Sequence, residues 1–187
     1  IQQIDLEKAV TESHKALDTY QKVSKIYSQS VSFFRLKHDV EQAEYLKSKN
    51  YEINGLNEFY EIGKEILNKK ENKENESNFN KEILLKDSEI QSLLPFYKTQ
   101  YIYQTPKLSG SVLNPDKDWN QVEMEYLNSA KQIMYIDDFL SKEAIKELRE
   151  FSLVSKVWIH QMPNKYLGAF SDSGFISPLH FQIGTEL

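Results

Sequence analysis

The spacing of apolar residues in the first third of the chain is the feature that most restricts the fold. Apolar side chains recur there at intervals of three, four and seven positions, which places them on one face of an α-helix. The first stripe contains Val10 and Leu17 and predicts a helix over about residues 5–29. Two further stripes predict helices over about 31–49 and 53–67. We therefore expect a predominantly α-helical chain.

The second and third stripes together resemble one tetratricopeptide unit, an antiparallel helical hairpin. Ala43 and Gly55 are small residues twelve positions apart, where the two helices would touch, and Phe59 follows four residues later. The usual Trp near the start and Pro at the end are absent, and only one unit is visible. Because one hairpin cannot bury its own apolar face, an ordinary antiparallel helical bundle remains the alternative.

The middle of the chain predicts connecting segments rather than long regular elements. Residues 69–82 are polar, charged and rich in Asn, so they predict a frayed helix end or a flexible linker, with an interaction tail as the alternative. Turn-forming residues interrupt the positions that follow: Pro95, Pro106, Gly110 and Pro115. Helical spacing returns at 119–130. The predicted organisation is a helical, repeat-like region over 1–95, a connecting belt over 96–131 and a final module over 132–187.

The final module combines strand-like and helix-like patterns. Residues 133–140 predict a short strand. Ser141 is a good N-cap for the helix that follows, and Glu143 lies in its first turn, where the helix dipole favours a carboxylate.

Two more strands and a last helix complete this pattern. Strands are predicted over 156–162 and 166–170, with Gly168 allowing another backbone to approach closely. A helix begins near Pro178, and its spacing continues to Leu187, so the chain is expected to be the front part of a larger protein. The predicted class is α+β: helical hairpins followed by a small α/β module.

Five short segments of the final module occur in an order that is similar to a known family. They are IDDFLS at 136–141, Trp158, YLGAF at 166–170, Gly174 with Phe175, and the helix over 178–187. Residues 112–187 thereby resemble the N-terminal part of a 2-oxoglutarate- and iron-dependent oxygenase. The resemblance is to the prolyl 4-hydroxylase-like type that follows tetratricopeptide repeats in some bacterial proteins. The pattern differs at two positions: Lys165 stands where the family often has a Gly, and His180 lies inside the aliphatic helix.

This resemblance implies that the final module is the start of a double-stranded β-helix domain. In that family a His-x-Asp pair and a distant His hold iron, and a basic residue grips 2-oxoglutarate, but these groups follow the matched segment. None of the histidines here begins a His-x-Asp or His-x-Glu sequence: His14, His38, His160 and His180. We therefore predict no catalytic, cofactor-binding or metal residue in this chain. Iron and 2-oxoglutarate are implied for the parent protein, and the chain alone is expected to be inactive.

Each candidate side chain also has a structural interpretation. His14 and His38 are expected on exposed helix faces, His160 at a strand end bonded to a backbone carbonyl, and His180 partly buried in its helix. The aromatic residues are expected in the core rather than as a substrate platform: Trp158, Tyr166 and Phe170. Of the paired carboxylates, one is expected to cap a turn and the other to face water: Asp137 and Asp138.

Composition excludes several classes of function. The chain has 23 Lys and Arg against 28 Asp and Glu, a net charge of -5, whereas nucleic-acid binding uses a clustered basic face. No apolar run approaches the roughly 20 residues that cross a bilayer, so no membrane span is expected. The lack of cysteine excludes disulfides and fits a cytoplasmic protein. Only Arg35 and Arg149 could hold a carboxylate in bidentate fashion.

Three functional hypotheses follow. The first is an inactive fragment of an oxygenase that hydroxylates a protein or peptide. The second is a helical protein-interaction module with a peptide or protein in its groove, and the third is a complete small enzyme of another class. The third has no support, because there is no Cys nucleophile, no glycine-rich phosphate loop and no Gly-x-Ser-x-Gly sequence. Exposed strand edges also predict a homodimer.

Overall fold

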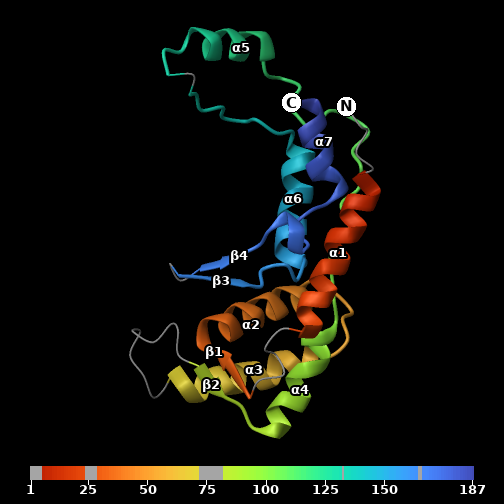
Figure 1. Ribbon diagram of the computed structural model, residues 1–187, viewed down its shortest axis with the longest axis vertical. Helices are drawn as coiled ribbons and strands as arrows, with labels where there is room; N and C mark the ends of the chain where they lie inside the picture. The colour runs from red at the N-terminus through yellow and green to blue at the C-terminus, as the bar shows by residue number, and fades with distance from the viewer. Residues whose placement is uncertain (1–5, 24–28, 72–81, 132, 164–165) are drawn as a thin grey trace. The chain divides into compact units, whose positions relative to one another are not determined.

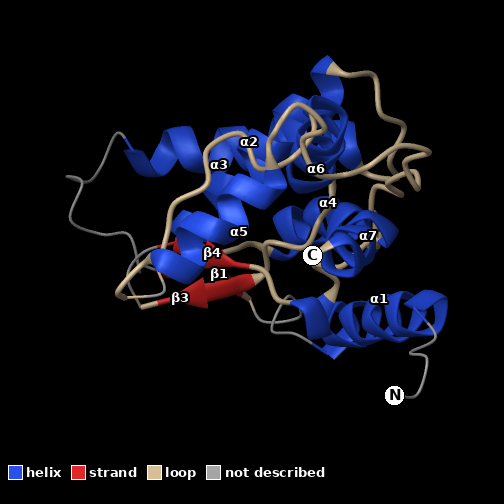
Figure 2. Cartoon of the chain, turned by 90° about the horizontal axis from the view of Figure 1, so that it is seen from above, coloured by secondary structure: helices blue, strands red, loops and turns tan. Residues whose placement is uncertain are grey.

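The computed structural model describes residues 6–23, 29–71, 82–131, 133–163 and 166–187. These residues form seven α-helices, one 3₁₀ turn and two small antiparallel sheets. The strands are short beside the helices (Figure 2). The predicted, predominantly α-helical character is therefore confirmed.

Contacts divide the chain into two compact units that interleave along the sequence. Unit 1 contains Ile1–Tyr103 and Ser152–Ile176, and unit 2 contains Gln104–Phe151 and Ser177–Leu187. The sequence predicted three consecutive regions, over 1–95, 96–131 and 132–187. This division stays a prediction.

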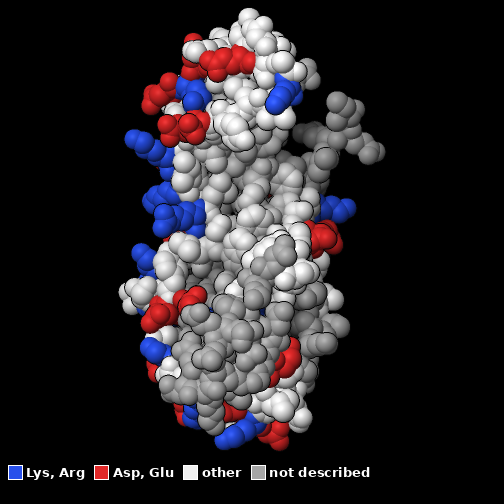
Figure 3. Space-filling model, turned by 90° about the vertical axis from the view of Figure 1, so that its left-hand side faces the viewer, with Lys and Arg blue, Asp and Glu red and all other residues white. Residues whose placement is uncertain are grey.

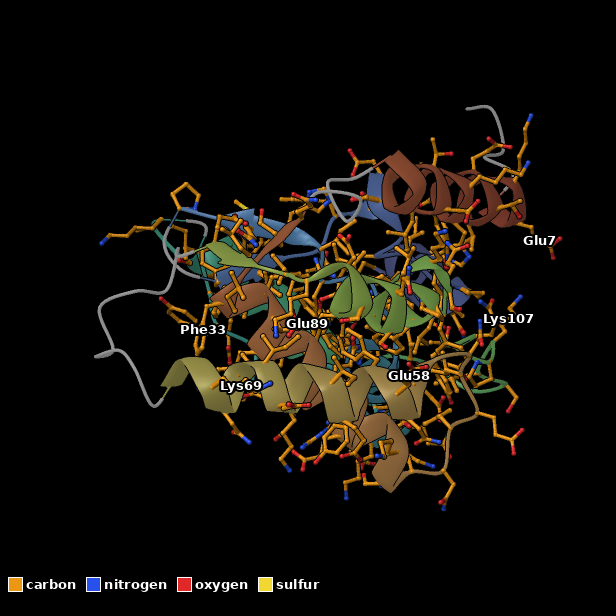
Figure 4. The ribbon with its side chains drawn as sticks, turned by 90° about the horizontal axis from the view of Figure 1, so that it is seen from below. Glu7, Phe33, Glu58, Lys69, Glu89 and Lys107 are labelled. Atoms are coloured by element: carbon orange, nitrogen blue, oxygen red, sulfur yellow. The ribbon has the colours of Figure 1, made fainter. Side chains whose placement is uncertain are left out.

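Four helices form the main part of unit 1, and Figure 1 labels them. They are α1 (Leu6–Val23), α2 (Phe33–Ser48), α3 (Leu56–Glu71) and α4 (Asp87–Lys98). The predicted first helix extends to residue 29, but Gln29 is not helical and residues 24–28 lie outside the described part of the chain. Figure 4 shows Glu58 and Lys69 near opposite ends of α3, where their charges complement the helix dipole.

The close packing of α3 on α2 depends on Gly63. A Cβ atom at this position would meet Val40 Cγ2 at 2.6 Å, so only glycine allows the approach. Gly55 was expected at this contact but lies in the turn before α3, at φ +76°, where a Cβ would meet Phe96 N at 2.7 Å. Gly55 therefore lets the turn pack on α4, and its left-handed backbone also favours glycine.

Aromatic rings fill the centre of the unit 1 core. Phe59 and Phe96 are fully buried, with ring centroids 4.3 Å apart, and Tyr97 lies edge-on to Phe59 at 5.0 Å. Burial of each such side chain stabilises the fold by roughly 1.5–3 kcal/mol. Pro95 lies within α4, although no long regular element was expected here. The helix continues past it to Lys98, although a proline at this position cannot donate the backbone hydrogen bond to residue 91.

A two-stranded sheet replaces the predicted start of the second helix. β1 (Ser30–Ser32) pairs antiparallel with β2 (Glu82–Leu84), with Val31 opposite Ile83. The helix begins only after Ser32, whose side chain accepts a 3.2 Å hydrogen bond from the Arg35 backbone N–H. Ser32 is thus the N-cap of α2, a role that serine side chains favour. Most of the predicted linker lies outside the described residues.

A second hairpin in unit 1 comes from the C-terminal third of the chain. β3 (His160–Met162) pairs antiparallel with β4 (Tyr166–Gly168), and Gln161 lies opposite Leu167. Both strands are shorter than predicted. Gly168 was expected to admit another backbone, but a Cβ there would meet the Met162 side chain of the paired strand at 3.4 Å.

Unit 2 contains α5 (Trp119–Asn128), most of α6 (Lys142–Val154) and α7 (Pro178–Glu186). Its small core consists of three buried residues, Val112, Ala144 and Leu179. Polar contacts add to it, because Glu186 accepts a 2.9 Å hydrogen bond from the Val112 backbone N–H and Gln182 accepts one of 3.0 Å from that of Leu108. The predicted final helix from Pro178 is confirmed.

The prediction of a strand over 133–140 is wrong. This segment makes one isolated bridge, between Leu113 and Leu140, and a turn with Asp138 at φ +50° interrupts it. A strand needs a neighbour along its length to satisfy its backbone, and the described residues supply one only at this end. The predicted cap is present, since Ser141 Oγ accepts from the Ala144 backbone N–H at 3.3 Å.

Candidate functional site

The candidate site is a pocket of about 270 Å³ between α2 and the β3–β4 hairpin of unit 1. Helix α2 contributes one face to it, at spacings of three, four and seven residues: Phe34, Lys37, His38 and Glu41. The hairpin segment contributes the opposite wall: Trp158, Tyr166 and Leu167. The core-facing residues of α2 lie on another side of the helix, so the pocket face is separate from the core.

Polar contacts hold the hairpin segment against α2. Gln161 Nε2 on β3 donates to Ser32 Oγ, the cap of the helix. Gln42 Nε2 donates to the backbone oxygens of Ser155 at 2.9 Å and Leu153 at 3.2 Å. These bonds hold the segment on either side of Trp158 against α2.

The aromatic residues of the hairpin side differ in how firmly they are held. The Trp158 indole N–H donates to the Ser152 backbone oxygen at 2.7 Å, and its ring lies 5.4 Å from that of Phe175. Tyr166 is 50 % exposed. The expectation that both belong to the core is therefore wrong for Tyr166, and Trp158, which is half-buried, is a rigid wall.

A buried ion pair lies on the inner side of the pocket. Asp39 is 3 % exposed, and its carboxylate contacts Arg35 Nε at 2.6 Å and His38 Nδ1 at 3.1 Å. Burial alone would raise the pKa of Asp39, but the charge of Arg35 and the hydrogen bonds from His38 and Arg35 outweigh it and lower the pKa. Asp39 is therefore ionised, and an ionised carboxylate can only accept hydrogen bonds.

The state of Asp39 determines what His38 offers to the pocket. Since Asp39 Oδ1 accepts, His38 Nδ1 must carry the proton of this contact. In the neutral imidazole the other nitrogen, Nε2, is then a hydrogen-bond acceptor. Among the described residues Nε2 of His38 has no partner, and His38 lines the pocket. The site thus combines aromatic walls with one oriented acceptor.

Two oppositely charged side chains on α2 complete the lining. Lys37 and Glu41 are four residues apart on the helix and both line the pocket. Their charges cancel, as do those of Arg35 and Asp39. On the face shown in Figure 3, acidic and basic side chains are interspersed. The pocket therefore has no strong net field that would select a highly charged ligand.

Lys156 is a second buried charge in unit 1. Its ammonium donates to the backbone oxygens of Phe96 and, at 2.5 Å, Thr99, and it lies 4.1 Å from the centre of the Phe96 ring. Burial lowers the pKa of Lys156 to about 7. The two carbonyl oxygens end helix α4, and a cation at that position complements the helix dipole.

Tyr97 carries a buried hydroxyl beside the same network. Burial raises the pKa of Tyr97 well above its ordinary value, and the negative charge of Asp39 adds to the rise. Although Asp39 is near, the hydroxyl makes no hydrogen bond of ordinary geometry with any described residue. An unpaired buried hydroxyl costs free energy, so Tyr97 is a weak point of the core.

The other histidines are held by local partners. His14 Nε2 lies 3.2 Å from the Ile176 backbone oxygen, and His160 Nε2 lies 2.8 Å from Ser173 Oγ. The expectation of an exposed position is wrong for both His14 and His38, which are half-buried. His160 was expected to bond a backbone carbonyl, and its Nε2 contacts the Ser173 hydroxyl instead. His180 is half-buried as predicted, 2.8 Å from Ser177 Oγ, and burial lowers its pKa.

The remaining candidates are exposed. Phe170 is 44 % exposed, although its ring packs edge-on to His160 at 4.9 Å, so it is not part of the core as expected. Asp137 and Asp138 both face solvent. Arg35 is engaged with Asp39 in the interior, and Arg149 is exposed on α6.

The described residues do not fit a bound iron ion. Within the described ranges, no three His, Cys, Asp or Glu side chains come together in a way that could hold a metal. Iron in oxygenases requires two imidazoles and one carboxylate on one face. We therefore derive no reaction step through iron or 2-oxoglutarate for these residues.

A scan against protein-family models and searches of curated proteins and solved structures found no match for this chain. The candidate site therefore rests on geometry alone.

None of the helices in the described part of the chain is long and apolar enough to cross a membrane. Sequence reasoning missed Lys37 and Glu41, although the spacing of the α2 pocket face was visible once the core-facing stripe had been assigned.

Proposed function

We propose that this chain is a helical protein-interaction module that binds an extended peptide segment at the pocket between α2 and the β3–β4 hairpin. The observation that carries the proposal is the pocket itself, with its wall of Trp158 and Tyr166 opposite one face of α2. Exposed aromatic residues beside a few polar groups are characteristic of binding surfaces.

The size of the pocket supports a peptide rather than a free cofactor. Pockets for whole small ligands occupy roughly 300–1,000 Å³. The volume of about 270 Å³ suits one large side chain, with the rest of the ligand lying outside. Tyr166 is half-exposed at the edge and can contact the backbone of such a ligand.

The helical hairpin of α2 and α3 is proposed as a tetratricopeptide-like unit that supports this function. Each helix has 16 residues, and Gly63 allows their close packing. Helix α3 also packs against α4, which supplies the neighbour that a single hairpin needs. An ordinary helical bundle with the same pocket would serve the proposed function equally well.

A random peptide library displayed on phage tests the proposal. The immobilised chain should enrich a consensus sequence, and Tyr166→Ser should weaken binding of the selected peptide at least tenfold because it removes half of the aromatic wall. Tyr135→Ser is the matched control, since Tyr135 is 95 % exposed and belongs to unit 2. No enrichment, or equal loss in both variants, would contradict the proposal.

A second proposal is that residues 112–187 are the lead-in of an oxygenase-like domain of the prolyl 4-hydroxylase type. The observation that favours it is the order of α6 after IDDFLS, then β3, β4 and α7, although residues 133–140 form no strand and Trp158 lies before β3 rather than in it. The parent protein would then use iron and 2-oxoglutarate to hydroxylate a peptide or protein. Incubated with iron, 2-oxoglutarate and ascorbate, this chain should form no succinate above a blank, and turnover would contradict the expectation that the chain alone is inactive.

Self-association is a further part of the proposal. Each of the two described sheets has only two strands, so strand edges remain for pairing with a second copy. Light scattering at increasing concentration should show a homodimer. A clean monomer at high concentration would count against pairing through these edges.

A further inference from the structure

The chemistry of the pocket between α2 and the hairpin limits which side chain can enter it. We propose that its ligand is a peptide anchored by an unmodified tyrosine, whose ring lies between the aromatic walls and whose hydroxyl donates a hydrogen bond to His38 Nε2. This inference deepens the proposed peptide-binding function and rests on it.

The shape and walls of the pocket favour one aromatic ring. Phe34, Trp158 and Tyr166 bring three aromatic side chains to a volume of about 270 Å³. Aromatic pairs prefer offset or edge-to-face contacts and gain more than their buried area alone provides. Trp158 is fixed by Ser152 and Phe175, so its ring needs little ordering when a ligand binds.

The polar group in the pocket favours a ligand that donates a hydrogen bond. His38 Nδ1 donates to the ionised Asp39, so in the neutral imidazole Nε2 is the acceptor. Arg35 holds Asp39 at 2.6 Å, so the orientation of the imidazole is fixed from the interior. Arg35 and Asp39 act here as positioning residues. Tyrosine is the aromatic side chain that carries an O–H donor at the far end of its ring.

The charges argue against the competing anchors. A phosphotyrosine would bring about two negative charges to a site with one lysine, Lys37, and one carboxylate, Glu41. A lysine side chain would gain from the aromatic faces and from Glu41, but Lys37 would repel it. An uncharged ring with one hydrogen-bond donor is repelled by neither Lys37 nor Glu41.

Titration with capped amino acids tests this inference directly. The probes are the N-acetyl amides of tyrosine, phenylalanine, O-methyltyrosine and lysine, and the signal is the indole N–H resonance of Trp158 in the intact chain. We expect roughly millimolar binding of the tyrosine probe. The phenylalanine and O-methyltyrosine probes should bind about fivefold more weakly, because each lacks the donor.

The variant His38→Asn provides the matched control. Asparagine can still donate to Asp39 but has no acceptor at the position of Nε2, so the preference for tyrosine over phenylalanine should disappear. His38→Gln places an amide oxygen near that position and should restore part of the preference. Both variants are compared at equal helical content, measured by circular dichroism.

The outcomes separate the inference from the proposed function. Equal binding of tyrosine and phenylalanine probes to the unmodified chain would overturn the tyrosine anchor but leave a peptide pocket. Tighter binding of the lysine probe would overturn it in favour of a cationic anchor. If no probe shifts the Trp158 resonance while library peptides still bind, the anchor is overturned and the binding site lies elsewhere. These ligand comparisons need no variant, so misfolding cannot obscure them.

Discussion

The cores of the two units differ greatly in size. Unit 1 buries a cluster of fourteen residues around α2, α3 and α4, whereas the cluster of unit 2 has three fully buried members. The larger core also contains the charged groups Asp39 and Lys156, both of which need partners in a dry interior. Unit 2 relies more on polar contacts from Gln182 and Glu186. Unit 1 thus combines buried charged groups with a large apolar core, whereas the smaller core of unit 2 is supplemented by polar contacts at its edge.

The largest expected effect comes from a cavity at the centre of the unit 1 core. Phe59→Ala should lower the free energy of unfolding by about 3–5 kcal/mol, because the ring is fully buried against Phe96 and Tyr97. Urea denaturation followed by circular dichroism measures the change. Leu84→Ala is the control: Leu84 is 77 % exposed, so this variant should lose little stability. A loss below about 1 kcal/mol for Phe59→Ala would contradict the described core.

Lys156 should make the stability of unit 1 depend on pH. Its pKa is about 7 in the folded chain against an ordinary 10.5, so between these values the unfolded chain binds more protons. The free energy of unfolding should therefore rise with pH, on the order of 2–3 kcal/mol between pH 7 and 9.5. Lys156→Met should remove this rise. Identical pH profiles for the two proteins would show that Lys156 is not buried as described.

A cavity in unit 2 should cost less and act locally. Leu179→Ala should lower stability by about 2 kcal/mol, at the lower end for such changes, because a core of three buried residues can collapse around the gap. Amide hydrogen exchange should increase in α7 and stay unchanged in α3. Equal acceleration in both helices would mean that the two units unfold together, which would remove the contrast between them.

The smallest effect is expected at the unpaired hydroxyl of unit 1. Tyr97→Phe should leave stability unchanged or raise it by about 1 kcal/mol, because the Tyr97 hydroxyl has no hydrogen-bond partner among the described residues. Thermal unfolding measures the change. A clear loss of stability would instead mean that the hydroxyl is hydrogen-bonded to Asp39, whose negative charge contributes to the raised pKa of Tyr97.

The contrast between the units also explains which predictions succeeded. Helices α2 and α3 were predictable because their apolar stripes face a large core, so periodicity and burial agree. The strand over 133–140 failed because its apolar residues Ile133 and Tyr135 are exposed rather than buried, at 68 % and 95 %. Strand propensity describes a half-buried surface, and here no sheet forms to bury it.

The candidate site could be predicted only in part. The sequence identified His38, Trp158 and Tyr166 as residues to weigh, but it did not indicate that they meet, because 120 positions separate His38 from Trp158. That meeting depends on long-range bonds such as Gln42 to Ser155. Short strands like β3 and β4, three residues each, are also set by tertiary contacts rather than local pattern.

The two tryptophans can show where a peptide binds, because one lies in each unit: Trp158 in the pocket and Trp119 on α5. Indole N–H resonances are recorded while a library-selected peptide is added to the intact chain. We predict that the Trp158 resonance shifts in a saturable way and that the Trp119 resonance does not move. A saturable shift of Trp119 alone, or of neither resonance with a peptide that binds, would contradict a binding site between α2 and the β3–β4 hairpin.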